Sequence, residues 1–165
     1  MESSRGLLIA ILVVCAGNLL VGVFQAGLLL RHPGAAAPAE AGNALPARFD
    51  AAALADVARR ITEPYNRGDL DGLFNALDDV VKVQLSRAEF DRQAKSMFDL
   101  IGRVDSAAYA SARKVESQAG LDAYELTYIV KLSASHFNSG ELLLSVVDRG
   151  SSLGVFAFFI NGRMQ

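Results

Sequence analysis

Hydrophobic positions in this chain follow three patterns in turn: one continuous run, then helical spacing, then alternation. No charged side chain occurs from Leu7 to Leu30. At ~1.5 Å rise per residue, a helix of that length extends about 36 Å and exceeds a hydrocarbon core of roughly 30 Å. The run predicts one transmembrane helix over residues 7–30, preceded by an N-terminal tail over residues 1–6.

A cleaved export signal and a lipoprotein signal are the alternatives for this segment. An export signal usually has an apolar core of ~7–15 residues followed closely by a small-residue cleavage site. The nearest such site, Ala-Pro-Ala at residues 37–39, lies well past the run, and Cys15 lacks small residues before it. An uncleaved anchor is therefore favoured, with Cys15 as one apolar residue of the helix.

Two amides interrupt the apolar run. Asn18 and Gln25 are seven residues apart and share a helix face with Gly22. Small residues allow close approach of two helices, and amides hydrogen-bond between helices in lipid. Two interpretations stay open: amides tolerated in a very apolar helix, or a helix–helix contact through Asn18, Gly22 and Gln25.

The anchor is followed by a tether and one domain. Residues 31–47 are rich in Ala, Pro and Gly without apolar periodicity, which predicts a tether. Residues 48–165 have the length of a single domain. Basic residues flank the run almost evenly, so they do not set its orientation. A short tail before one span is typical of a signal anchor, so we expect the domain on the extracytoplasmic (periplasmic) side of the inner, or plasma, membrane.

After the tether, apolar positions are spaced for three helices. Asp50 and Asp69 are the predicted N-caps of the first two, and Gly68 ends the first. Ser86 and Glu89 have the spacing of a capping box at the start of the third. The apolar faces comprise Leu54, Val57, Ile61 and Tyr65, then Leu70, Leu73, Phe74 and Leu77, then Phe90, Ala94, Met97, Phe98 and Ile101.

From Gly102, which ends the third helix, the period changes to two. The alternation predicts strands over residues 104–117, 123–133, 141–147 and 153–160. The tetrapeptide Asp-Arg-Gly-Ser before the last strand has the composition of a hairpin turn. Three helices followed by four sequential strands predict an α+β domain, with the helices packed on one face of a four-stranded antiparallel sheet.

This element order, together with the loop Asn-Arg-Gly-Asp at residues 66–69, resembles the nuclear transport factor 2-like superfamily over about residues 49–160. The resemblance implies a cystatin-like α+β cone, in which a curved sheet wraps around the first helix. Within that superfamily the chain is most similar to small exported or membrane-tethered domains of unassigned function. It departs from them in the last hairpin, where Ser152-Leu153 stands at a position that often carries Trp.

Charge and composition exclude several kinds of partner and chemistry. The formal net charge is -2 with both signs mixed, and the chain has no Trp, which argues against nucleic acid. Four aspartates lie around the second helix; Asp69 and Asp71 fit capping, while Asp78 and Asp79 fit a solvated loop. We expect no catalytic residue, no metal site and no cofactor.

Four aromatic residues are candidates for an apolar ligand pocket between the helices and the sheet. They are Tyr65, Phe98, Tyr109 and Tyr128. The alternative is that all four are ordinary core residues. The resemblance also includes isomerase-like and dehydratase-like enzymes, which need a pocket carboxylate or His. His32 lies in the tether and His136 near a turn, so neither fits that role.

The last two strands are apolar on both faces. A sheet with helices on one face and water on the other should alternate apolar and polar residues. An exposed apolar face of this size normally marks an interface. The candidate interface residues are Leu143, Val147, Phe156, Phe158 and Ile160.

These observations favour a non-catalytic, membrane-anchored accessory or scaffold protein. Its sheet face would bind itself or a larger membrane protein, and the face of Asn18, Gly22 and Gln25 would add a contact in the bilayer. A sensor or carrier of a small apolar ligand is the first alternative. An isomerase-like or dehydratase-like enzyme is the second.

Overall fold

The computed structural model describes residues 45–118, 120–134 and 136–163. The predicted transmembrane helix, with Asn18, Gly22 and Gln25, lies outside these ranges, as does most of the tether. Within them, no helix has the length and apolar character needed to span a bilayer.

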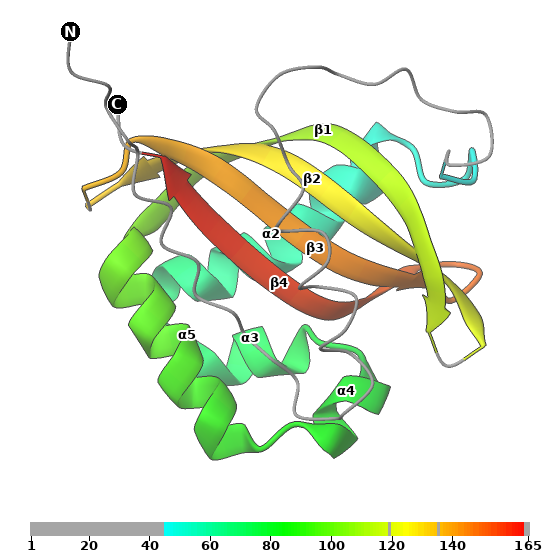
Figure 1. Cartoon of the computed structure of the whole chain (residues 1–165), viewed down its shortest axis with the longest axis horizontal. Coiled ribbons are helices and arrows are strands. Elements are labelled where there is room, and N and C mark those ends of the chain that lie inside the picture. Colours follow the sequence, from blue (N-terminus) through cyan, green and yellow to red (C-terminus); the bar gives the residue numbers. More distant parts are fainter. Residues whose placement is uncertain (1–44, 119, 135, 164–165) are drawn as a thin grey trace, which may run out of the picture.

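The described chain forms helices first and strands afterwards, joined into one four-stranded sheet (Figure 1). Sequential strands are neighbours and antiparallel, in the order β1-β2-β3-β4. The predicted α+β class and the antiparallel meander are therefore confirmed. The elements are α2 (Ala51–Arg67), α3 (Leu70–Asn75), α4 (Asp79–Gln84), α5 (Arg87–Ile101), β1 (Arg103–Gln118), β2 (Leu121–Ser133), β3 (Ser139–Asp148) and β4 (Leu153–Arg163).

The predicted ends of the first helices are confirmed. The Asp50 carboxylate accepts a hydrogen bond from Ala53 N at 2.9 Å, and that of Asp69 accepts one from Gly72 N at 2.8 Å. Gly68 ends α2 with a φ of 64°, a left-handed conformation that glycine adopts without the steric cost of a Cβ.

Two predictions about the helices are wrong. The structure adds α4, so within the described residues four helices rather than three precede the strands. Asp78 is the N-cap of α4 rather than a solvated loop residue. The capping box does not form: α5 begins at Arg87, but the Ser86 side chain makes no cap hydrogen bond. Glu89 instead accepts from Arg92 at 3.1 Å and from Gln93 at 3.2 Å, because side chains three and four residues apart meet on a helix.

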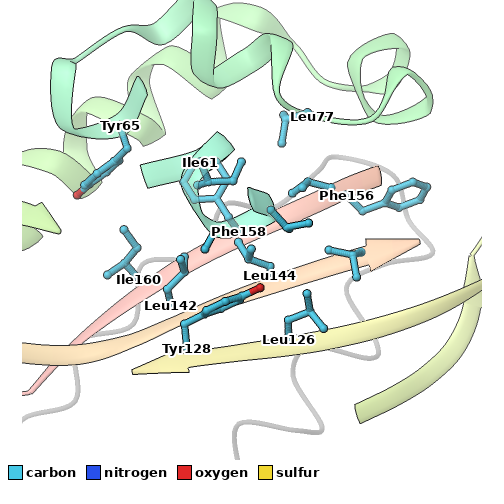
Figure 2. Packing of buried hydrophobic residues seen from close by; sticks show 14 of the residues in the cluster. Ile61, Tyr65, Leu77, Leu126, Tyr128, Leu142, Leu144, Phe156, Phe158 and Ile160 are labelled. Carbon is cyan, nitrogen blue, oxygen red and sulfur yellow. The ribbon is translucent and has the colours of Figure 1, made fainter. Parts of the chain in front are cut away.

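The core lies between α2 and the helix-facing side of the sheet, called here the inner face (Figure 2). Ile61 projects from α2 toward alternate residues of three adjacent strands. Phe158 meets Phe90 of α5 edge-on, with ring centroids 6.5 Å apart. The inner-face residues in this contact layer are Leu126 and Tyr128 of β2, Leu142 and Leu144 of β3, and Phe158 and Ile160 of β4.

Candidate functional site

The opposite side of the sheet, the outer face, carries its own apolar row. Leu143 in β3 lies beside Thr127 of β2 and beside Phe159 of β4. Leu142 and Leu144, which flank Leu143 in β3, point toward the helices (Figure 2). Because side chains alternate along a strand, Leu143 and its neighbours Thr127 and Phe159 point away from the helices. The predicted division of β3 into two apolar faces is therefore confirmed.

Exposure divides the outer face into a closed part and an open part. Val147 has no exposed surface, and Phe159 and Thr127 have 7% each. Ile129 of β2 is 49% exposed, its β1 neighbour Ala108 is exposed, and Leu143 is half-buried. The open apolar surface is therefore centred on Ile129 and extends toward Leu143.

Ion pairs flank the row on both sides. Arg113 of β1 lies 3.3 Å from Glu125 of β2, and Arg163 of β4 lies 2.5 Å from Glu141 of β3. Arg113 faces Glu125 directly across the two strands, whereas Glu141 lies two residues from Ser139, the residue that faces Arg163. Each end of the outer face thus carries an ion pair, and the exposed Lys131 of β2 adds a second base at the end that holds Arg163.

Three predicted interface residues lie elsewhere. Phe158 and Ile160 are 2% exposed each and pack on the inner face, so they belong to the core. Phe156 is 7% exposed and belongs to the same buried cluster. The cause is a register shift between Ser145 and Val146, which lets β4 carry one extra residue and breaks its simple alternation.

The four aromatic pocket candidates form two separate pairs. Tyr65 meets Phe98 edge-on at 5.5 Å, and Tyr109 meets Tyr128 edge-on at 5.8 Å. Tyr65 and Phe98 line a cleft of about 90 Å³ between α2, α3 and α5, whereas the other two do not. The structure therefore does not bring the four rings together around one cavity.

Tyr65 and Tyr128, the two buried tyrosines among the four candidates, donate hydrogen bonds to backbone carbonyls. Tyr128 OH lies 2.8 Å from Leu54 O, and Tyr65 OH lies 3.3 Å from Met97 O. Burial raises the pKa of both phenols above the ordinary value, with a smaller effect of the Asp99 charge on Tyr65 and of Tyr109 on Tyr128. Their hydroxyl groups fix α2 to the sheet and to α5.

The space between helices and sheet is filled by apolar side chains. Thr127 is the buried polar residue of the described ranges, and it lies on the outer face. Within those ranges, no three His, Cys, Asp or Glu side chains gather where they could hold a metal ion. Asp78, with 7% of its side chain exposed, is held by Arg149 through two hydrogen bonds of 2.9 and 2.6 Å.

A larger hollow of about 240 Å³ lies between the N-terminal half of α2 and the β3–β4 turn. Sequence patterns gave no signal for it, because its walls come from two segments almost a hundred residues apart. The lining consists of Arg48, Phe49, Ala53, Asp56, Val57, Arg60, Ser151, Ser152 and Leu153.

Comparison with known proteins assigns this chain to no family. The sequence matches no protein-family model, and a search of curated proteins finds no significant match.

Proposed function

We propose that this chain is a non-catalytic, single-pass membrane-anchored accessory protein. Its α+β domain lies on the extracytoplasmic side and binds a second copy of the chain through the outer face of the sheet. The observation that carries this proposal is the open apolar surface around Ile129, on the side of the sheet that α2 and the other described helices leave uncovered.

A second copy suits the charges around this surface. Each end of the outer face carries both an acid and a base, with Lys131 as a further base at one end, so a second copy placed face to face can meet opposite signs at each end. A C2 interface uses the same patch twice and needs such self-complementarity. The resemblance to cone-like domains and the apolar run over residues 7–30 support the tethered arrangement.

The filled interior supports a binding role over the two alternatives. A carrier of a small apolar ligand needs a cavity of roughly 300–1,000 Å³, whereas the cleft beside Tyr65 and Phe98 measures about 90 Å³. An enzyme of the isomerase type needs a carboxylate or His within the pocket. The inner face instead presents packed aliphatic and aromatic side chains.

The test is self-association of the full-length chain in mild detergent, measured by energy transfer between labelled copies. Ile129→Glu places an unpaired charge in the proposed interface and should weaken association at least about tenfold, which is about 1.4 kcal/mol. Val83→Glu is the matched control, because Val83 is 88% exposed on α4, within the helical layer.

Equal association of both variants would contradict the proposed surface. A wild-type chain that stays monomeric, or that binds a larger membrane protein at fixed stoichiometry, would contradict the second copy as partner. Far-UV circular dichroism of each variant checks that the fold is intact.

A further inference from the structure

An open strip of the outer face runs along β1 and β2, with a charged β2 residue on each side of its apolar centre. Lys131, Ile129 and Glu125 of β2 pair with exposed residues of β1. Because Lys131 and Glu125 are an even number of residues apart, strand alternation places both on the outer face. Their midpoint, position 128, is adjacent to Ile129. The β1 residues that face this row, including Thr127, are Ser106, Ala108, Ser111 and Arg113.

The base and the acid of this row are both able to bind a further charge. Lys131 is exposed and is in no ion pair with a described residue. Glu125 has 17% of its side chain exposed, and Arg113 lies 3.3 Å from its Oε1, which is long for a hydrogen bond between charged groups. The second carboxylate oxygen of Glu125 can therefore accept from another base. Each copy thus offers a base on one side of Ile129 and an acceptor on the other.

These charges distinguish the two ways in which β2 of one copy can lie on β2 of another. Sheets that pack face to face commonly keep their strands aligned within about 30°, either parallel or antiparallel. In a parallel twofold stack each residue meets its own counterpart, so Lys131 lies on the partner's Lys131, and like charges in contact cost free energy. In an antiparallel stack about position 128, Lys131 meets the partner's Glu125. Ile129 then lies over the partner's Thr127, beside the partner's Leu143.

We propose that two copies stack antiparallel through this strip, with Lys131 of each copy paired with the partner's Glu125. This inference rests on the proposed function and adds the orientation of its interface. Twofold symmetry makes each contact twice, so one interface holds two such ion pairs around the Ile129 residues. Charge pairs of this kind fix orientation and exclude wrong pairings more than they add affinity.

The experiment reverses the two charges, separately and together, and measures self-association of the full-length chain in mild detergent by energy transfer. Lys131→Glu brings glutamates together and Glu125→Lys brings lysines together, so each should weaken association at least about tenfold. The chain that carries both changes restores opposite charges and should associate as wild type does, as should an equal mixture of the two single variants. Lys95→Glu is the matched control, since Lys95 is exposed on α5, within the helical layer.

A milder variant gives a readout that does not depend on charge reversal. Glu125→Lys also removes the pair with Arg113, so Glu125→Gln, which keeps the shape of the side chain, is measured beside it. Added salt screens ion pairs and should weaken association of the wild type. The same salt should weaken association of Glu125→Gln less, because that variant lacks the proposed pairs.

Failure of this inference can be told apart from failure of the proposed function. Single reversals that associate as wild type does would overturn the antiparallel pairing, because a parallel stack keeps like charges together before and after each change. A double variant as weak as the single ones, or an unchanged salt dependence in Glu125→Gln, would overturn it too. In these cases dissociation by Ile129→Glu would leave the proposed function standing. A wild-type chain that stays monomeric would overturn both.

Discussion

Phe158→Ala distinguishes a core residue from an interface residue. Phe158 is 2% exposed, lies beside the fully buried Leu144 and meets the Phe90 ring. Truncation of a phenylalanine in such a site removes its burial and leaves a cavity, at a cost of about 3–5 kcal/mol. For a domain of this size that corresponds to a fall in Tm of roughly 10–20 °C.

The assay is thermal and urea unfolding of the full-length chain in mild detergent, followed by near-ultraviolet circular dichroism. Leu143→Ala is the control, since Leu143 lies one residue along β3 from the position that pairs with Phe158, on the outer face, and is half-buried. It should lose about 1–2 kcal/mol. A loss for Phe158→Ala smaller than that for Leu143→Ala, together with loss of self-association, would refute the assignment of Phe158 to the core.

Three further changes test the packing and the buried polar groups. Asp78→Asn should lose about 1–3 kcal/mol at neutral pH, against almost none for the exposed Asp79→Asn. Burial raises the pKa of Asp78, but hydrogen bonds from Arg149 and Val80 outweigh burial and lower the pKa below 3.8. The stabilisation by the Asp78 carboxylate is therefore lost as the pH falls below that value, and urea midpoints measured across acidic pH would record the loss. Tyr128→Phe should lose about 1 kcal/mol at neutral pH, by chemical unfolding, because Leu54 O loses its donor. Burial raises the pKa of Tyr128 above 10.0, so the neutral phenol stabilises the fold below pH 10 and this stability is lost as pH rises; the variant should show a shallower alkaline decline. Gly162→Ala should lose about 1–3 kcal/mol in urea unfolding, because the added Cβ would overlap the Phe137 ring; an unchanged midpoint would contradict this packing.

The parts of the fold that sequence reasoning predicted are those fixed by local chemistry. Asp50, Gly68 and Asp69 act at helix ends through their own side chains or backbone freedom. The strands were found within a few residues of their ends, because alternation in β2 and β3 follows directly from burial of one face.

The missed features depend on contacts between distant segments. The helix α4 has six residues with three valines, which are weak helix formers. It is held in place where Asp78 N donates to Val155 O of β4 and where the Asp78 carboxylate meets Arg149. A capping pattern covers only a few neighbouring residues, so it cannot predict either of these long-range contacts.

The candidate sites show the same division. Alternation correctly predicted that Leu143 points to the opposite face from Leu142 and Leu144. It wrongly assigned Phe158 to the interface, because the hydrophobic pattern does not reveal the extra residue in β4. The hollow between Arg60 and the β3–β4 turn arises only when the last hairpin closes beside α2. Neither segment carries a motif by itself.

The most direct test of the proposed interface is photo-crosslinking in native membranes. A photoreactive amino acid replaces Ile129 in one preparation and Val83 in another, and the products are identified by mass. If two copies meet through the outer face, position 129 gives a product of about 35 kDa, twice the chain mass of 17.6 kDa, and position 83 gives none. A product from position 83 alone, or from position 129 only with a different protein, would contradict this interface.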